Sequence, residues 1–296
     1  MAHRDLPFHV VDVFAESRFA GNQLAVVLNA TQLGTSKMQQ IAREFNFSET
    51  TFLTSRSPEK FTVRIFTPQF ELSFAGHPTL GTAYVIQQKI IRKKVQKVSL
   101  SLKVGKIPVT FAYKRESPDI LWMKQNEPRF RKTEVEPNEI ARALGIDLEK
   151  IDTGRPIEEV STGLPFIIVP LRSLKTLRRC TVDRRLYSDL VTKTEAKSIL
   201  VFSPEAYRDR SDFSVRVFTE YLGISEDPAT GSGNGCLAAY LSRHKYFGTS
   251  NIDAVVDQGY EVGRPSKLYL KASNTGKIRV DVGGRVFAVA SGSISL

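Results

Sequence analysis

The sequence has few cysteines and no long apolar run, and these absences exclude several classes of protein. Only Cys180 and Cys236 occur among 296 residues, which is too few for a disulfide framework and gives no metal-ligand spacing. No apolar run approaches the ~18 residues of a membrane-spanning helix, and the first residues lack the apolar core of a signal peptide. We therefore expect a cytoplasmic protein that does not enter a membrane.

Several familiar chemical signatures are also missing. There is no Walker phosphate loop, and the glycines of residues 231–235 have the wrong spacing for a dinucleotide fingerprint. The four histidines show no paired metal spacing, and no Gly-x-Ser-x-Gly elbow occurs. Cys236 falls inside a predicted helix, so we interpret it as a small core residue rather than a nucleophile. The sequence thus predicts no metal site.

Acidic residues are outnumbered, and the formal net charge is +11. Such a charge is compatible with nucleic acid or acidic ligands, but the lysines and arginines are spread widely. The densest stretches, residues 89–97 and 178–185, are not interleaved with the aromatic side chains on which nucleic-acid bases would stack. We therefore predict a solvated basic surface and treat nucleic-acid binding as the minority interpretation.

The most informative feature that is present is a duplication. Residues 61–67, Phe-Thr-Val-Arg-Ile-Phe-Thr, return as residues 213–219, Phe-Ser-Val-Arg-Val-Phe-Thr, with five of seven positions identical. A small-residue turn follows each copy and carries one titratable group beside a proline, His77 in the first turn and Asp227 in the second. A repeated strand–turn–helix unit predicts two similar halves. We expect a cleft between these halves that brings His77 and Asp227 together.

Strand-like and helix-like patterns alternate in both halves. The spacing predicts helices over residues 36–45, 79–89, 137–144 and 233–244, among many short strands. The last part of the chain reads as a run of antiparallel strands separated by glycines. These patterns indicate an α+β protein with two related domains. We place the domains at residues 1–118 and 119–296, and leave open a return of the C-terminal tail to the first domain.

The two turns have the properties of an anion site. Each turn ends where a helix begins, so backbone N–H groups and the helix dipole favour a negative charge there. Gly76, Gly231 and Ser232 let a ligand approach the backbone closely. The alternative is that these residues merely make tight turns, that His77 is a structural histidine and that Asp227 caps a helix. Two matched turns, each with a titratable residue, favour a site that suits a carboxylate.

Glu49 is a third candidate for chemistry. It belongs to a short polar segment inside an otherwise apolar, phenylalanine-rich stretch, residues 45–53. A glutamate held against aromatic side chains loses solvation, which raises its pKa and lets it exchange protons near neutral pH. The alternative is a solvated loop carboxylate, and spacing alone does not decide between the two.

Together these motifs resemble the phenazine biosynthesis-like (PhzF-like) family, which shares the fold of diaminopimelate epimerase. The resemblance spans nearly the whole chain. Gln23 departs from the family pattern, which usually has proline there; this loosens a turn and removes no reactive group. The matching segments are residues 21–22 with 24–27, 47–50, 74–79, 226–232, 258–259 and 263–266.

The resemblance implies two α+β domains, each a mostly antiparallel sheet around a central helix, with the active site between them. It also implies a homodimer without metal or organic cofactor. The characterised isomerase of the family acts on trans-2,3-dihydro-3-hydroxyanthranilate. By analogy Glu49 would move a proton between carbons, and His77 and Asp227 would hold the substrate and assist with polar protons. The pocket and carboxylate-binding residues would be Asn22, Ser48, Gly76, Gly231 and Ser232.

Three other functions remain open from the sequence. Epimerases of this fold use two opposed cysteines, whereas the equivalent turns here carry His77 and Asp227, so we expect isomerisation rather than racemisation or epimerisation. A non-catalytic protein that binds a small molecule or regulates another protein could keep the same fold. Nucleic-acid binding through the positive charge is the third alternative.

Overall fold

The computed structural model describes residues 5–57 and 60–296, and the chain divides into two compact units. Unit 1 comprises Met1–Met123 and Gly283–Leu296, and unit 2 comprises Lys124–Val282. The sequence had placed the boundary after residue 118 and left the tail open. The tail belongs to unit 1 because its last strand pairs with the first strand of the chain from end to end, a long-range pairing that no local pattern predicts.

Unit 1 is built on a chain of paired strands. Beginning with the tail strand, the order is β18, β1, β2, β3, β4, β6, β7 and β8, and the short β5 pairs with the end of β4, on the same edge as β6. All pairs are antiparallel except β2–β3 and β4–β6. The strands are β1 (Leu6–Val13), β2 (Asn22–Val27), β3 (Glu49–Ser57), β4 (Lys60–Phe66), β5 (Glu71–Leu72), β6 (Lys97–Leu102), β7 (Gly105–Lys114), β8 (Ser117–Lys124) and β18 (Val286–Ile294).

Two helices pack on opposite faces of this sheet. Helix α2 (Gly76–Val85) is buried along almost its whole length. At Gly81 it lies so close to the inward-facing Val11, Val13 and Leu24 that a Cβ atom at this position would clash with their side chains. Helix α1 (Thr35–Phe45) is amphipathic and buries one stripe against outward-facing residues of the sheet. A 3₁₀ turn, η1 (Ala30–Gln32), precedes α1, and a π-helix, η2 (Ile86–Ile91), extends α2.

Unit 2 repeats this connectivity. Its order is β9, β10, β11, β12, β13, β15 and β16, with β14 on the end of β13, along the same edge as β15. The parallel pairs, β11–β12 and β13–β15, occupy the same places in the order as β2–β3 and β4–β6 in unit 1. The strands are β9 (Arg129–Lys132), β10 (Glu158–Ser161), β11 (Pro165–Pro170), β12 (Ile199–Ser203), β13 (Phe213–Thr219), β14 (Ile224–Asp227), β15 (Ile252–Gln258), β16 (Ser266–Asn274) and β17 (Ile278–Gly284), which leads back to unit 1.

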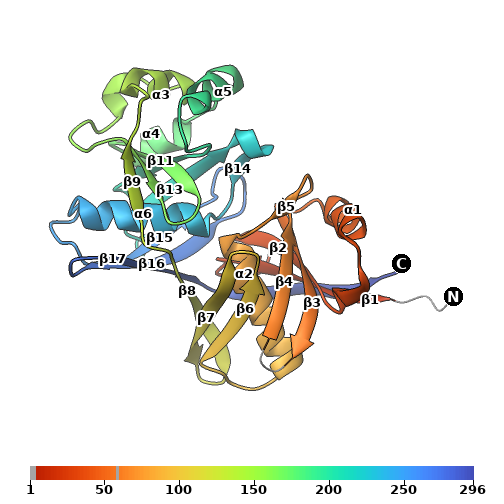
Figure 1. The fold of residues 1–296 in the computed structure, drawn as a ribbon. Helices are drawn as coiled ribbons and strands as arrows, with labels where there is room; N and C mark the ends of the chain where they lie inside the picture. Colours follow the sequence, from red (N-terminus) through yellow and green to blue (C-terminus); the bar gives the residue numbers. More distant parts are fainter. Residues whose placement is uncertain (1–4, 58–59) are drawn as a thin grey trace. The chain divides into compact units, whose positions relative to one another are not determined.

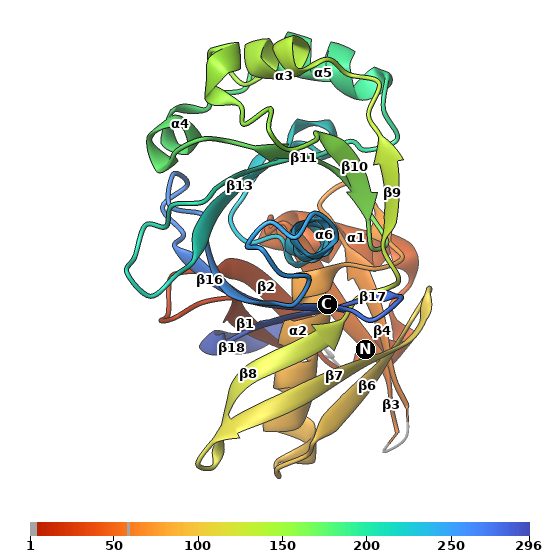
Figure 2. The same ribbon diagram turned by 90° about the vertical axis from the view of Figure 1, so that its left-hand side faces the viewer.

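The central helix of unit 2 is α6 (Gly231–Arg243), which the curved sheet surrounds in Figure 2. On the outer face lie α3 (Pro137–Ala143), α4 (Leu174–Arg179) and α5 (Arg184–Thr192), which share an apolar cluster with that side of the sheet (Figure 1). The sequence patterns indicated only a basic stretch at residues 178–185, and they did not predict α4 or α5. Their signals were the caps, since Ser173 and Asp183 accept from backbone N–H groups of the first turn. Two 3₁₀ turns complete the unit, η3 (Leu148–Lys150) and η4 (Glu220–Leu222).

Both central helices begin earlier than their patterns predicted. The expected starts were residues 79 and 233, whereas α2 begins at Gly76 and α6 at Gly231. Pro78 therefore lies in the first turn of α2, where its missing N–H would have had no helical partner. His77 consequently belongs to the helix itself rather than to a turn before it, and its side chain is fixed by a buried helix.

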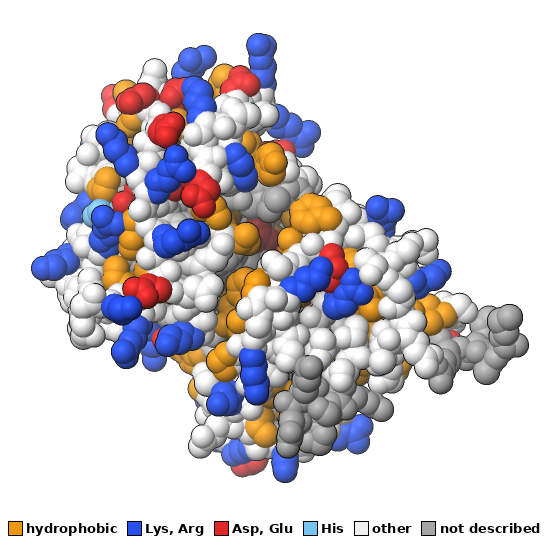
Figure 3. Space-filling view, in the orientation of Figure 1, with side chains coloured by type: hydrophobic (Ala, Val, Ile, Leu, Met, Phe, Trp, Pro, Cys, Tyr) orange, Lys and Arg blue, Asp and Glu red, His pale blue; other side chains and the backbone are white. Residues whose placement is uncertain are grey.

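The charged side chains are dispersed over the surface, as the sequence predicts. On the face shown in Figure 3, lysines and arginines are scattered over both units with acidic side chains among them. Across residues 5–57 and 60–296, no helix has the length and apolar character needed to cross a membrane.

Candidate functional site

Two of the three predicted catalytic residues meet inside unit 1. Glu49 is the first residue of β3, which runs parallel to β2 with Leu24 opposite Glu49. His77 lies in the first turn of the central helix α2. Nε2 of His77 is 3.3 Å from Oε2 of Glu49, and the two side chains are 6% and 15% exposed. A strand start and a helix start thus bring a carboxyl group and an imidazole into contact away from bulk water.

Burial keeps the imidazole neutral. Desolvation lowers the pKa of His77 to about 3, and a hydrogen bond to the backbone of Gln23 opposes this effect. Because that bond raises the pKa, the ring must donate in it, since donation stabilises the protonated ring. Nε2 makes no hydrogen bond to the described residues and faces Glu49, so the donor is Nδ1. At neutral pH the lone pair of Nε2 is therefore directed at Glu49.

This arrangement defines what the pair can do with a proton. An ionised carboxylate and an imidazole lone pair are both acceptors, so they can form a hydrogen bond only when a proton lies between them. One proton placed on Oε2 of Glu49 would be donated to Nε2 of His77. The two side chains can therefore share a single proton. Because the imidazole is neutral, it does not hold Glu49 in a permanent ion pair. Such a carboxyl group is suited to general acid–base chemistry.

The predicted binding residues of unit 1 adjoin this pair. Asn22 is the first residue of β2, is buried, and precedes Gln23, whose backbone holds His77. Ser48 is half-buried and precedes Glu49, while Gly76 is the first, buried residue of α2. All three therefore lie where β2, β3 and α2 begin, next to the backbone N–H groups of a helix start.

The remaining predicted residues gather at one place in unit 2. Asp227 ends β14, and its Oδ2 lies 2.5 Å from the hydroxyl of Thr230. Gly231 and Ser232 are the first two residues of α6, and both are buried. Asp227 thus stands at the start of the second central helix as His77 stands at the start of the first. The predicted meeting of His77 and Asp227 in a shared cleft stays a prediction.

The sequence interpretation missed Gln258 as a member of this second group. Gln258 ends β15, is fully buried, and hydrogen-bonds to both Asp227 and Thr230. Its signal was present, because residues 258–259 belong to the motifs that carry the family resemblance. A buried amide makes no obvious chemical signature, however, so it received no role.

Neither cysteine has the properties of a nucleophile. Cys236 is fully buried in α6, and burial raises the pKa of its thiol to about 12. Burial likewise raises the pKa of the Cys180 thiol to about 12. Nucleophilic cysteines need the opposite shift, so both are core residues. Within the described ranges, no group of three or more His, Cys, Asp and Glu side chains is placed to hold a metal ion.

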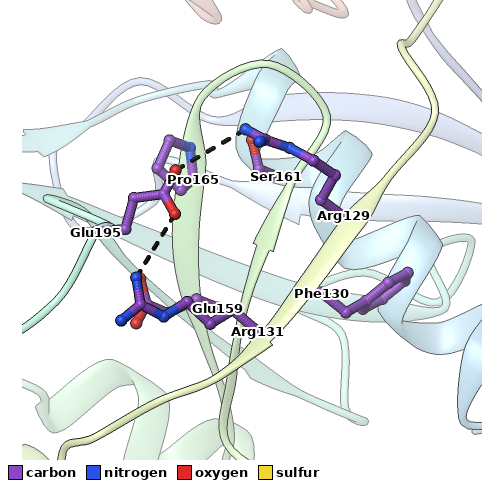
Figure 4. A pocket seen from close by; sticks show the side chains of 7 residues that line it. All are labelled: Arg129, Phe130, Arg131, Glu159, Ser161, Pro165 and Glu195. Carbon is purple, nitrogen blue, oxygen red and sulfur yellow. Dashed lines mark ion pairs between the residues drawn. The ribbon is translucent and has the colours of Figure 1, made fainter.

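A separate cavity of about 210 Å³ lies in unit 2, between β9, β10 and β11 (Figure 4). Glu195 reaches between Arg129 and Arg131, at 3.8 Å from each guanidinium, so the protein already compensates the positive charge there. The cavity contains none of the predicted site residues, and we assign it no ligand. Its lining consists of Arg129, Phe130, Arg131, Glu159, Ser161, Pro165 and Glu195.

Comparison with known proteins places this chain in a family. The model of the phenazine biosynthesis-like proteins, PhzC-PhzF, matches residues 11–292. A trans-2,3-dihydro-3-hydroxyanthranilate isomerase from Pseudomonas fluorescens is 34% identical over 291 residues, which cover 97% of this chain and 98% of that protein.

Solved structures agree with this placement. A PhzF-family phenazine biosynthesis protein from Bacillus anthracis superposes with a TM-score of 0.90 at 25% identity, covering 99% of this chain and 100% of the other. A hydroxyproline epimerase from Agrobacterium vitis, 12% identical, shares the fold with a TM-score of 0.64 over 100% of this chain and 93% of its own. The two-domain α+β architecture is thus of the epimerase type, and the chain belongs to the phenazine biosynthesis-like (PhzF-like) family.

Proposed function

We propose that this protein is a cofactor-independent isomerase that moves a carbon-bound proton within a small unsaturated or cyclic carboxylate. The observation that carries the proposal is the buried contact between Glu49 and neutral His77. The family relatives include a trans-2,3-dihydro-3-hydroxyanthranilate isomerase, so that compound is the first substrate to test.

In the proposed step, ionised Glu49 removes a proton from carbon. The C–H bond breaks, an O–H bond forms on Glu49, and the electron pair enters the conjugated system of the substrate. While it resides on Glu49, the proton can exchange with solvent; Glu49 then delivers a proton to a second carbon on the same face, which shifts the double bond and regenerates the carboxylate. One base that acts on one face gives an allylic shift, whereas inversion at one carbon needs a second base on the opposite face.

The other predicted residues receive supporting roles in this proposal. Backbone N–H groups at the two helix starts bind the substrate carboxylate, where Gly76, Gly231 and Ser232 permit close approach. Asn22 and Ser48 line the pocket. His77 and Asp227 hold the substrate and exchange its polar protons. We further propose a homodimer that needs neither metal nor membrane.

The test is a screen in D₂O. Cyclic and unsaturated amino acids, beginning with trans-2,3-dihydro-3-hydroxyanthranilate, are incubated with the protein, and deuterium on carbon is followed by NMR. Glu49→Gln should lower turnover by roughly 10²–10⁴-fold, the usual contribution of a general acid–base group. Glu116→Gln is the matched control, because Glu116 is almost fully exposed in the same unit.

The outcomes separate the alternatives. Exchange that is lost in Glu49→Gln and kept in Glu116→Gln supports the proposal. Undiminished turnover of Glu49→Gln would remove Glu49 from the mechanism. Exchange with inversion at a single carbon would identify an epimerase. Binding of these compounds without any exchange would indicate a non-catalytic binding protein.

A further inference from the structure

The side-chain amide of Gln258 hydrogen-bonds to three residues between the end of β14 and the first turns of α6: Asp227, Thr230 and Asn234. Its Nε2 lies 2.8 Å from the backbone oxygen of Asp227 and 3.0 Å from the hydroxyl of Thr230. Its Oε1 accepts from the backbone N–H of Thr230 at 3.2 Å and from the side-chain amide of Asn234 at 2.8 Å. Gln258 and Asn234 are fully buried, and Thr230 is 7% exposed. The amide therefore uses both its ends on one turn, away from solvent.

The direction of each hydrogen bond is fixed. A backbone oxygen can only accept and a backbone N–H can only donate, so Nε2 of Gln258 must be the nitrogen that faces Asp227 and Thr230. An amide nitrogen has no lone pair to offer, so the hydroxyl of Thr230 must accept from it. The hydrogen of that hydroxyl is then directed to Oδ2 of Asp227, 2.5 Å away. The chain of donation runs from Gln258 through Thr230 to the carboxyl group of Asp227.

A second observation shows that this hydroxyl is not used for ordinary helix capping. Thr230 is the N-cap residue of α6, where threonine normally accepts from the second or third N–H of the helix. Its side chain makes no such bond here. The structure gives up a contact that commonly stabilises a helix and directs the hydroxyl at Asp227 instead.

We propose that Thr230 and Gln258 are positioning residues that hold the carboxyl group of Asp227 as an acceptor in one orientation. This inference rests on the role proposed above for Asp227. A hydrogen bond donated to a carboxylate is stronger than one between neutral groups. Thr230 therefore stabilises the ionised form of Asp227 and its rotamer, and Gln258 supports Thr230. Neither side chain needs to touch the substrate to affect turnover.

The first measurement compares Thr230→Val with Thr230→Ser. Valine keeps the shape of threonine and removes the hydroxyl, whereas serine keeps the hydroxyl. With trans-2,3-dihydro-3-hydroxyanthranilate as probe, Thr230→Val should lower kcat roughly 10- to 100-fold, the range for loss of one charge-assisted hydrogen bond, with KM within about threefold. Thr230→Ser should restore kcat to within about threefold of the wild type. Equal kcat in Thr230→Val and the wild type, or equal losses in both variants, would overturn the proposal.

The second measurement does not depend on turnover. In protein labelled with ¹⁵N-glutamine, the side-chain amide signal of Gln258 is identified by its loss in Gln258→Glu. Its hydrogen exchange should become at least tenfold faster in Thr230→Val and remain slow in Thr230→Ser. Thr230→Ala replaces the valine variant in both measurements if valine does not fold.

The two measurements keep the proposals apart. If the wild-type protein does not act on the probe, the proposed substrate fails and the amide measurement alone decides the hydrogen-bond chain. Unchanged amide exchange in Thr230→Val would overturn the chain even if turnover falls.

Discussion

The two units carry the same ion pair on their duplicated strand, but they surround it differently. In unit 1, Arg64 of β4 donates from Nε and one terminal nitrogen to the two carboxylate oxygens of Glu71, at 2.7 and 2.8 Å. In unit 2, Arg216 of β13 makes the same two bonds to Glu226, at 3.0 and 2.7 Å. Each arginine also lies over the phenylalanine two positions further on. The duplication therefore preserved a structural clamp between neighbouring strands.

The difference lies in burial and in what the clamp supports. The Arg64 side chain is 24% exposed, whereas that of Arg216 is 8% exposed. Arg216 also donates to the backbone oxygens of Leu177 and Cys180, at the end of α4. Its partner Glu226 is the residue directly before Asp227. The arginine–glutamate clamp is common to both units, which diverged in the segments after it, with His77 at the start of α2 in one unit and Asp227 at the end of β14 in the other.

We expect the largest effect when the arginine–glutamate ion pair is broken in one unit at a time. Arg216→Met leaves the carboxylate of Glu226 buried without its cation and frees two buried backbone oxygens. Removing one partner of a buried ion pair costs about 3–5 kcal/mol. Arg64→Met should cost only about 1 kcal/mol, because this pair is nearer to solvent and Lys103 remains 2.7 Å from Glu71. Urea unfolding of both variants measures the difference.

Equal destabilisation by the two variants would contradict the idea that burial sets the strength of the clamp. Arg216→Lys is the control for charge. Lysine keeps the positive charge but cannot make the bidentate contact, so it should lie between the wild type and Arg216→Met.

The second prediction concerns how buried His77 of unit 1 affects the stability of the protein at acidic pH. The pKa of His77 in the folded protein is about 3, below the ~6.5 of an unfolded histidine. As the pH falls from about 6.5 toward 3, the unfolded chain binds a proton here that the folded protein does not bind. The stability contributed by neutral His77 is therefore present above pH 6.5 and is lost as the pH falls. By pH 4 the loss is roughly 3 kcal/mol, since one pKa unit corresponds to about 1.4 kcal/mol.

His77→Gln should remove this dependence, so that wild type and variant differ by roughly 3 kcal/mol more at pH 7 than at pH 4 in their free energies of unfolding. Urea denaturation at a series of pH values provides the measurement. Glu49→Gln, which keeps the buried histidine, should retain the acid loss. A difference between wild type and His77→Gln that does not change with pH would show that His77 is not held neutral by burial.

The sequence predicted the duplication and named Glu49 and His77 as candidates, but it did not predict that these two side chains meet. The repeated strands and the central helices follow from local pattern, whereas the contact between Glu49 and His77 was not predicted, because it depends on how β3 and α2 pack. The tail strand and the unit boundary depend on pairing between the two ends of the chain, which local periodicity does not contain. Gln258 was missed because its role comes from four hydrogen bonds to partners up to 31 positions away, not from its own chemistry.

The smallest expected effect tests how tightly each central helix is enclosed. A Cβ atom at Gly81 of α2 would lie 2.9 and 3.1 Å from the methyl groups of Val13 and Val11, which are stiff, β-branched side chains. Gly81→Ala should therefore destabilise the protein by about 1–3 kcal/mol, as overpacking does. A Cβ atom at Gly235 of α6 would meet the side chain of Gln125 at 3.0 Å, and this unbranched side chain is more flexible than valine. Since alanine gains about 1 kcal/mol over glycine inside a helix, Gly235→Ala should be nearly neutral. Thermal unfolding that ranks the two variants in the opposite order would mean that α2, not α6, has the looser surroundings.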